Sequence, residues 1–187
     1  FPKGILTQSA EARQKAYDKF NATIGIATEN LHTMHLPSVM QSIQGLRTSD
    51  TLTYAPSFGI PGLRQAWKDA MIKKNPTLKD KHISLPIVTN GITHGISVFA
   101  DMFLDPDDVV IFPDKMWGNN ILIMSVRRDA EINHYPLFSD AGGFNIAAFE
   151  KTVRMHAHNN YKVIVFLNFP NNPTGAVATK EVLKKWV

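Results

Sequence analysis

The sequence contains no cysteine among its 187 residues. This absence excludes a disulfide scaffold, a thiolate zinc site, an iron–sulfur centre and a cysteine nucleophile. It is also compatible with a reducing compartment. The chain has no apolar run of the roughly 20 residues that a membrane-spanning helix requires. We therefore expect a cytoplasmic protein that has no membrane partner.

The sequence also lacks a strong excess of charge of one sign. It has 20 Lys and Arg residues and 16 Asp and Glu residues, which give a net charge of +4. Nucleic-acid-binding proteins usually gather their cations on one face. Here the densest basic stretch, residues 73–81, is interrupted by Pro76 and Asp80. We expect a solvated turn there and no nucleic-acid partner. The histidines show no spacing typical of a metal site, and none is predicted.

From about residue 83 onward, short apolar segments alternate with longer amphipathic ones. This alternation predicts an α/β fold with a mostly parallel sheet flanked by helices on both faces. The predicted strands are 83–88, 109–112, 131–135 and 162–167, and the predicted helices are 91–103, 117–126, 144–156 and 179 onward. Before them, helices are predicted at 9–20 with Ser9 as cap, at 37–47, and from Pro61 to just before Pro76.

Two of the predicted strands end in segments suited to ligand binding, and ligands of parallel sheets gather at such ends. Gly91, Ile92 and Thr93 open a helix, where exposed amides and the helix dipole favour a phosphate. An ordinary strand-to-helix turn is the alternative. Trp117 follows the strand 109–112 and is suited to stacking a flat aromatic ligand. Its alternative is a core tryptophan at a helix start.

The segment Asn168–Gly175 follows the last predicted strand and reads Asn-Phe-Pro-Asn-Asn-Pro-Thr-Gly. Its prolines, asparagines and glycine specify a stiff, irregular turn. An X–Pro bond adopts the cis form at modest cost, and we predict a cis bond between Asn172 and Pro173. Such a turn can direct an asparagine amide into a cleft. A plain loop is the alternative.

The run Asn-Asn-Pro-Thr-Gly resembles the signature of class I/II pyridoxal-phosphate aminotransferases of fold type I. The segment from Tyr54 to Arg64, with its Gly-Ile-Pro-Gly-Leu-Arg run, is similar to another signature of that family, and Ile24-Gly25 resembles its N-terminal glycine segment. The resemblance implies a homodimeric enzyme that uses pyridoxal 5′-phosphate to transfer an amino group between an amino acid and a 2-oxo acid. It also implies an N-terminal arm and small-domain segment at 1–50 and the first part of the cofactor-binding large domain at 51–187.

The resemblance further implies a role for each matching cofactor residue. The backbone amides of Gly91, Ile92 and Thr93 are expected to hold the cofactor phosphate, and the hydroxyl of Thr93 is expected to bind it as well. Trp117 is expected to stack on the pyridine ring. Asn172 is expected to donate to the phenolic oxygen of the ring, which would stabilise the phenolate. Trp117 and Asn172 are expected to meet the substrate as well.

Two further residues are assigned by the same resemblance. Tyr54 is expected to reach the cofactor phosphate of the neighbouring subunit, which implies a dimer. Gly25 is expected to leave room for a backbone contact with the substrate carboxylate.

The catalytic lysine of such an enzyme is unknown here. The chain ends 15 residues after Asn172, and Lys180, Lys184 and Lys185 are expected on the polar face of the last helix. We expect the Schiff-base lysine, the aspartate for the pyridine nitrogen and the substrate-binding arginine to lie beyond Val187. The sequence, which opens without methionine, is accordingly expected to be about half of a longer protein and to be inactive by itself.

Three alternatives stay open at this point. A lyase or synthase with the same cofactor would show the same residues. A non-catalytic effector or binding domain of this fold is a second possibility. A nucleotide-binding α/β domain is the third, and it would need an acidic residue after the second strand to hold a ribose, for which Asp114 is a weak candidate.

Overall fold

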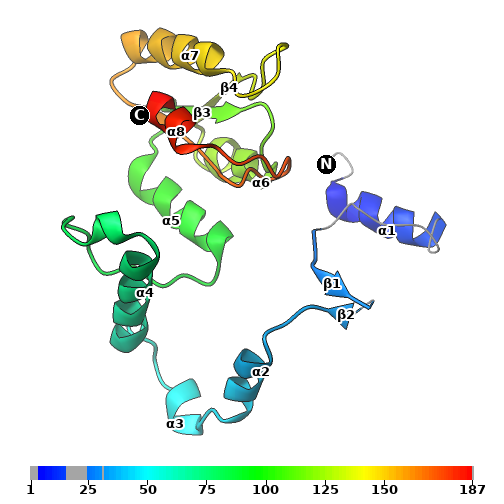
Figure 1. The fold of residues 1–187 in the computed structure, drawn as a ribbon, viewed down its shortest axis with the longest axis vertical. Helices are drawn as coiled ribbons and strands as arrows, with labels where there is room; N and C mark the ends of the chain where they lie inside the picture. The colour runs from blue at the N-terminus through cyan, green and yellow to red at the C-terminus, as the bar shows by residue number, and fades with distance from the viewer. Residues whose placement is uncertain (1–3, 16–24, 31, 187) are drawn as a thin grey trace. The chain divides into compact units, whose positions relative to one another are not determined.

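The structure is a computed structural model that describes residues 4–15, 25–30 and 32–186. The chain divides into two compact units, Phe1–Ala55 and Pro56–Val187. The first unit contains short elements joined by extended segments (Figure 1). In chain order these are α1 (Ile5–Lys15), β1 (Thr28–Glu29), β2 (His32–Thr33), α2 (Pro37–Gln44) and α3 (Thr48–Thr51). The strands β1 and β2 form a small antiparallel hairpin.

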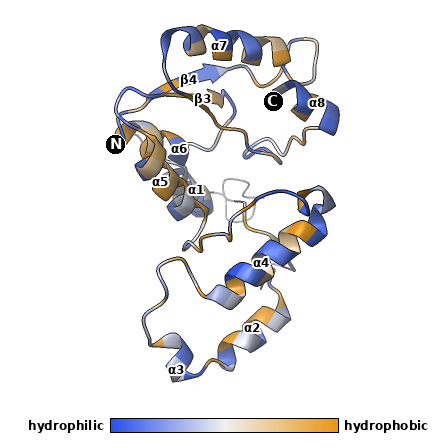
Figure 2. Ribbon diagram, turned by 90° about the vertical axis from the view of Figure 1, so that its left-hand side faces the viewer, coloured by the Kyte–Doolittle hydropathy of each residue, from blue (hydrophilic) through white to orange (hydrophobic). Residues whose placement is uncertain are grey.

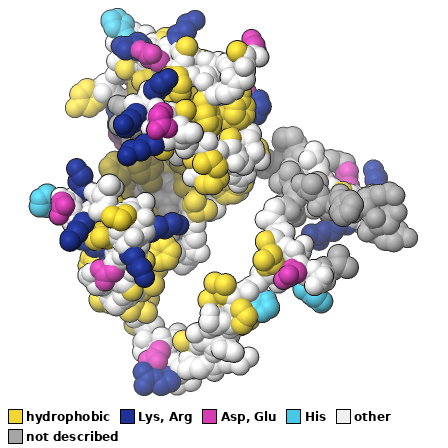
Figure 3. All heavy atoms as spheres, in the orientation of Figure 1, with side chains coloured by type: hydrophobic (Ala, Val, Ile, Leu, Met, Phe, Trp, Pro, Cys, Tyr) yellow, Lys and Arg dark blue, Asp and Glu magenta, His cyan; other side chains and the backbone are white. Residues whose placement is uncertain are grey.

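The first unit leaves many apolar side chains exposed. Neither α2 nor α3 buries a residue. Figure 3 shows hydrophobic side chains at the surface of this part of the chain, and those more than 45% exposed include Ile26, Met34, Leu36, Val39, Met40, Ile43, Leu46 and Leu52. The described residues of this unit therefore do not enclose a core around these side chains. The expected assignment of 1–50 and 51–187 to a small and a large domain stays a prediction.

The helices of the first unit differ from the predicted ones. Helix α1 begins at Ile5, so Ser9 lies within the helix and is not its cap. The end predicted at residue 20 lies outside the described residues. Helix α2 ends at Gln44 because Gly45 follows it, and the short α3 was not predicted.

The second unit contains a parallel sheet of three strands. Strand β3 (Val109–Pro113) lies between β4 (Glu131–Tyr135) and β5 (Val163–Val165). Both pairings are parallel, with Val109 opposite Glu131 on one side and Val163 on the other. The predicted α/β architecture is confirmed, although β5 is shorter than the predicted strand 162–167.

Both faces of β3 are covered by helices, and every residue of the strand is buried. Because side chains alternate along a strand, Val110 and Phe112 join one cluster while Val109 and Ile111 join the opposite one. The first cluster includes Ala100 of α5 (Ile92–Phe103) and two residues of a π-helical turn, Leu122–Val126. The second includes residues of α7 (Ile146–Asn159) and α8 (Lys180–Trp186). Helix α7 carries apolar and polar residues along its length, as an amphipathic covering helix does (Figure 2).

The strand predicted at 83–88 is wrong. This segment has no regular secondary structure and pairs with no strand among the described residues. Two side chains of α4 (Pro61–Lys74) bind its carbonyl groups instead, since Lys68 Nζ donates to Ile83 O at 2.8 Å and Arg64 Nε donates to Pro86 O at 2.7 Å. Pro86 also lacks the N–H that a ladder needs. The apolar pattern did not reveal the hydrogen-bonding partners of this segment, which are side chains of α4.

The helices of the second unit follow the predictions with shifted ends. Asn145 caps α7, because its Oδ1 accepts a hydrogen bond from Ala148 N at 3.0 Å. The helix predicted at 117–126 is instead a short α6 (Asn119–Ile121) that continues into the π-helical turn. The basic stretch 73–81 contains the short 3₁₀ helix Pro76–Leu78, which agrees with the turn predicted there.

Candidate functional site

The connections after β3 and β5 leave the sheet toward opposite faces. After β3 the chain enters the π-helical turn, whose Ile123 and Met124 pack with Phe112. After β5 it enters α8, whose Trp186 packs with Ile111 on the other face. Since β3 and β5 are parallel neighbours, this arrangement opens a crevice outside their carboxyl ends, which is where α/β sheets bind ligands.

Residues from both strand ends line a small depression at this crevice. The end of β3 and the residues that follow it contribute Pro113, Met116, Trp117 and Asn120. The residues that follow β5 contribute Phe166, Asn168, Asn171 and Asn172. Its volume is about 10 Å³, the space of one water-sized sphere, so it is too small to enclose a ligand. The fold therefore brings together Trp117 and Asn172, the two residues that the resemblance assigns to the cofactor ring.

The turn after β5 is held in shape by Asn171. This side chain is 3% exposed. Its Nδ2 donates to Lys115 O at 3.1 Å, and its Oδ1 accepts from Thr174 Oγ1 at 2.7 Å. Gly175 N donates to Asn171 O at 2.7 Å and closes the turn. Sequence reasoning missed this structural role, because the partner Lys115 O lies 56 residues away in the chain.

The adjacent Asn172 is exposed, and no hydrogen bond of its side chain exists within the described part of the chain. Its amide is thus available to a ligand, whereas the amide of Asn171 is engaged. The bond from Asn172 to Pro173 is cis, which confirms the prediction. The bond from Phe169 to Pro170 is also cis and was not predicted.

The start of α5 is open and uncapped. The helix begins at Ile92, directly after Gly91, and no side chain caps it. The amides of Ile92 and Thr93 have no acceptor within residues 4–15, 25–30 and 32–186, as expected for a first helical turn. A Cβ atom placed on Gly91 would meet nothing within 4 Å. An anionic group therefore has free access to these amides and to the positive end of the helix dipole.

The helix start and the depression share one hydrophobic core. Ile96, one turn into α5, and Met116, the neighbour of Trp117, both pack against the cluster that contains Phe112. Phe166, which lines the depression, packs against the same cluster. The start of α5, which is the candidate phosphate site, and the depression lined by Trp117 thus pack against the same hydrophobic cluster.

Tyr54 and Gly25 belong to the other unit, Phe1–Ala55. Tyr54 is fully exposed, and Gly25 is exposed with nothing within 4 Å of an added Cβ. Ile24 lies outside the described residues. The roles expected for Tyr54 and Gly25 stay predictions.

Asp114, the candidate ribose ligand, is already engaged. Its Oδ1 accepts from Leu137 N at 2.9 Å, and its other oxygen forms an ion pair with Lys115. Burial acts to raise the pKa of Asp114, but the hydrogen bonds from Lys115 and Leu137 outweigh it and hold the pKa below its usual range. Burial together with the Asp114 charge raises the pKa of Tyr135 to about 12. These contacts disfavour a nucleotide site here.

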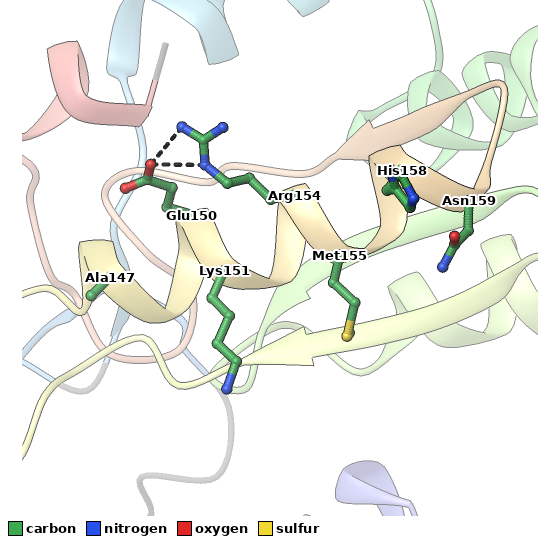
Figure 4. A pocket seen from close by; sticks show the side chains of 7 residues that line it. All are labelled: Ala147, Glu150, Lys151, Arg154, Met155, His158 and Asn159. Carbon is green, nitrogen blue, oxygen red and sulfur yellow. Dashed lines mark hydrogen bonds and ion pairs between the residues drawn. The ribbon is translucent and has the colours of Figure 1, made fainter.

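A broader hollow on the surface runs along one side of α7 and is lined by exposed residues such as Lys151 and Met155 (Figure 4). Arg154 donates to Glu150 Oε1 there from Nε at 2.9 Å and from Nη2 at 2.7 Å. Because a single helix supplies its lining, this hollow offers a ligand no convergent groups.

The described residues contain no group of three or more side chains placed to hold a metal ion. Among the helices that the structure describes, none is long and apolar enough to cross a bilayer.

Comparison with known proteins identifies the family. Residues 18–187 match the sequence pattern of the family "Aminotransferase class I and II". The chain belongs to this family. The class I and II aminotransferases depend on pyridoxal 5′-phosphate, the cofactor that the sequence resemblance implied, and the family assignment made from the sequence is confirmed.

Two curated aminotransferases illustrate the similarity. The chain is 32% identical over 151 residues to the "Probable aspartate/prephenate aminotransferase" of Aquifex aeolicus, an alignment that covers 76% of the chain and 34% of the relative. It is 34% identical over 140 residues to the LL-diaminopimelate aminotransferase of Dehalococcoides mccartyi strain 195, covering 71% of the chain and 32% of the relative. The chain thus spans about a third of the length of these relatives.

Solved aminotransferase structures share the fold. The chain superimposes on the aminotransferase of Anaerococcus prevotii with a TM-score of 0.86 and 23% identity, over 99% of the chain and 47% of that structure. It superimposes on the cytoplasmic aspartate aminotransferase of Saccharomyces cerevisiae with a TM-score of 0.79 and 19% identity, over 100% of the chain and 46% of that structure. These likenesses confirm the α/β fold of the aminotransferase type.

Proposed function

We propose that the full-length protein is a pyridoxal-phosphate-dependent aminotransferase that transfers an amino group between an amino acid and a 2-oxo acid. The observation that carries this proposal is the crevice between β3 and β5, where Trp117 and the available amide of Asn172 line one depression. The names of curated relatives, among them aspartate/prephenate and LL-diaminopimelate aminotransferases, favour it over a lyase, a synthase or a binding domain.

The residues present fit the cofactor in three respects. The uncapped start of α5 offers the amides of Ile92 and Thr93 to a phosphate, and the space at Gly91 is open. The indole of Trp117 is half-buried at the depression, and an indole can stack on an aromatic ring. The exposed amide of Asn172 offers a hydrogen bond to a ring oxygen.

When bound, pyridoxal 5′-phosphate supplies the electron sink that amino-group transfer requires. The chain's own residues bind and orient it. We assign phosphate binding to Gly91, Ile92 and Thr93, where the amides and the helix dipole stabilise negative charge. Trp117 covers one face of the ring and excludes water from it. Asn172 donates a hydrogen bond to the phenolic oxygen, which favours its ionised form and lowers its pKa.

The proposed enzyme is a cytoplasmic homodimer. The absence of cysteine is compatible with a reducing compartment. The fully exposed side chain of Tyr54 supports a role at a subunit interface, where it would contact the phosphate of the neighbouring subunit. We further propose that Gly25 admits the substrate carboxylate, and that Trp117 and Asn172 contact the substrate.

The test is cofactor retention by the protein expressed from the full open reading frame. We expect the purified protein to show a visible absorbance band that borohydride abolishes, and to release pyridoxal 5′-phosphate that mass spectrometry identifies. A colourless protein that contains no cofactor and does not take it up on incubation would contradict the proposal.

A further inference from the structure

The dipeptide Asn90-Gly91 lies directly before α5 and is the sole Asn-Gly pair in the sequence. Asparagine is a thermally labile residue, and a following glycine makes its deamidation easiest because glycine has no side chain to shield its backbone nitrogen. Asn90 is exposed. Every other asparagine of the chain precedes a residue that carries a side chain. The local sequence therefore marks Asn90 as the most reactive asparagine.

The hydrogen bonds around this pair leave both of its reacting groups free. Asn90 N donates to His94 Nδ1 at 3.2 Å. Gly91 O accepts from Gly95 N at 3.0 Å and from Thr89 Oγ1 at 3.1 Å. By contrast, the side-chain amide of Asn90 and the backbone N of Gly91 have no partner in the part of the chain that the structure describes. These two groups are the ones that deamidation joins.

Deamidation of Asn90 requires only water as a co-reactant. Gly91 N attacks Cγ of Asn90 and forms a new C–N bond, while the bond from Cγ to Nδ2 breaks and ammonia leaves with the proton of Gly91 N. The product is a cyclic succinimide. Water then opens the ring at either carbonyl carbon and yields aspartate, or isoaspartate with an additional backbone methylene. Either product carries a negative charge near neutral pH, which asparagine lacks.

The new carboxylate would lie next to the amides of Gly91, Ile92 and Thr93, which we assign to the cofactor phosphate. Like charges repel, so the carboxylate would lower the affinity of this site for an anion. The positive end of the α5 dipole would at the same time stabilise the carboxylate in the empty site. The charge of the deamidated residue would therefore weaken phosphate binding without destabilising the fold.

We propose that Asn90 is a site of spontaneous deamidation, that its conversion weakens phosphate binding at the start of α5, and that a bound phosphate protects it. Protection follows because the phosphate would engage Gly91 N, the attacking atom. The effect on binding and the protection rest on the proposed function, whereas the conversion itself does not. A protein that has lost its cofactor would thus gradually lose the capacity to bind it again.

The first experiment follows deamidation in the full-length, cofactor-free protein. After incubation at mildly alkaline pH, peptide mapping by mass spectrometry measures the conversion of each asparagine. Asn159 is the internal control, because it is exposed but precedes Asn160, whose backbone N donates to His156 O at 3.1 Å. We expect Asn90 to convert at least about tenfold faster than Asn159. Conversion of Asn90 no faster than that of Asn159 would overturn the assignment of the site.

The same mapping tests protection. Saturating pyridoxamine 5′-phosphate should slow the conversion of Asn90 and leave that of Asn159 unchanged. Equal conversion of Asn90 with and without this probe, in a protein that binds it, would overturn the protective role of the phosphate.

The second experiment measures the consequence of the new charge. Asn90→Asp reproduces the aspartate product, and Asn90→Gln is the matched uncharged control. Calorimetric titration of the full-length, cofactor-free proteins with pyridoxamine 5′-phosphate should give a dissociation constant about tenfold weaker for Asn90→Asp, equivalent to about 1.4 kcal/mol. Asn90→Gln should bind as wild type does. The loss for Asn90→Asp should shrink as salt concentration rises, because salt screens the repulsion. Its melting temperature should equal or exceed that of wild type.

The outcomes separate the modification from the proposed function. Equal affinity of Asn90→Asp and wild type would overturn the link between deamidation and phosphate binding and leave the proposed function intact. A lower melting temperature of Asn90→Asp would overturn that link too, since the weaker binding would then come from a damaged fold. A wild-type protein that does not bind the probe would contradict the proposed function, and the mapping experiment would still decide whether Asn90 is a deamidation site.

Discussion

The side-chain Nδ2 of Asn171 donates a hydrogen bond to the carbonyl oxygen of Lys115 at 3.1 Å, across 56 residues of sequence. This bond joins the turn after β5 to the loop after β3. Trp117 lies two residues from Lys115, and Asn172 is the neighbour of Asn171. The bond therefore fixes the relative positions of the two side chains that we assign to the cofactor ring.

Replacing Asn171 with alanine should destabilise the protein. The change removes the hydrogen bonds to Lys115 O and Thr174 Oγ1 and leaves buried groups without partners. We expect a loss of about 2 kcal/mol in the free energy of unfolding, measured by urea denaturation. Binding of pyridoxamine 5′-phosphate should weaken as well, because the turn that carries Asn172 loses its support.

Replacing Asn172 with alanine should separate binding from stability. Its side chain is exposed and makes no hydrogen bond to the described residues, so the free energy of unfolding should change by less than about 0.5 kcal/mol. Affinity for pyridoxamine 5′-phosphate should fall by about tenfold, the usual worth of one lost hydrogen bond to a ligand. Equal loss of stability in the two asparagine variants would contradict the distinct roles assigned to them.

Replacing Gly175 with alanine tests the backbone of the same turn. Gly175 has φ of +72°, in the left-handed region, and an added Cβ would meet nothing within 4 Å. The expected loss of about 1 kcal/mol in the free energy of unfolding therefore comes from the backbone alone. Gly118→Ala is the control, because Gly118 has φ of −60° and equally open surroundings, and it should cause no loss. Equal effects of the two substitutions in urea denaturation would rule out this account.

Much of the second unit was predictable because its signals are local. The wholly apolar Val109–Phe112 segment predicted a buried strand, and the structure confirms it. The density of asparagine and proline after β5 identified the turn that contains Asn172. Each of these features depends on residues within a few positions of one another.

Features that depend on distant partners were not predictable in this way. The segment 83–88 has a strand-like pattern, but its carbonyls bind the side chains of Arg64 and Lys68, which lie 15 or more residues away. The partner of Asn171 is 56 residues away, so its structural role could not be read from the turn. The free backbone N of Gly91, next to Asn90, emerged only when the structure showed which groups the surrounding hydrogen bonds join.

The ion pair of Lys162 with Asp108 should make stability depend on pH. Burial acts to raise the pKa of Asp108, but the hydrogen bonds from Lys162 and Asp105 and the Lys162 charge hold it below its ordinary value. A depressed carboxyl pKa stabilises the fold above the unfolded value, about 4, and this contribution disappears as pH falls through the folded value. The stability difference between wild type and Lys162→Met should thus be constant near neutrality and narrow below about pH 4.

Part of the stability difference between wild type and Lys162→Met should persist at acidic pH, because Lys162 Nζ also donates to Phe103 O at 2.8 Å. Lys151→Met, at an exposed position of α7, serves as the control and should show no such pH dependence. Urea denaturation at pH values from 3 to 7 measures both variants. A difference for Lys162→Met that does not narrow in acid would contradict a stabilising role of the ion pair.

Replacing Trp117 with alanine should weaken binding of pyridoxamine 5′-phosphate about tenfold, since ring stacking contributes roughly 0.5–1.5 kcal/mol beyond the buried area. Trp117→Phe should retain part of the affinity. Trp67 is the control, because it is an exposed indole that lines a separate groove with Leu63 and Val88. Calorimetric titration should show wild-type affinity for Trp67→Ala. A similar effect of both alanine substitutions would contradict the assignment of the ring seat to Trp117.

The most direct test of the proposed function is a half-reaction followed in the visible spectrum of the full-length protein loaded with pyridoxal 5′-phosphate. An amino-acid donor added without a 2-oxo acid should convert the cofactor to its amine form and remove the visible band. A 2-oxo acid added afterwards should restore it, with stoichiometric release of the new amino acid. A band that persists with every amino acid tested, or that is lost and cannot be restored by any 2-oxo acid, would contradict amino-group transfer as the function of this protein.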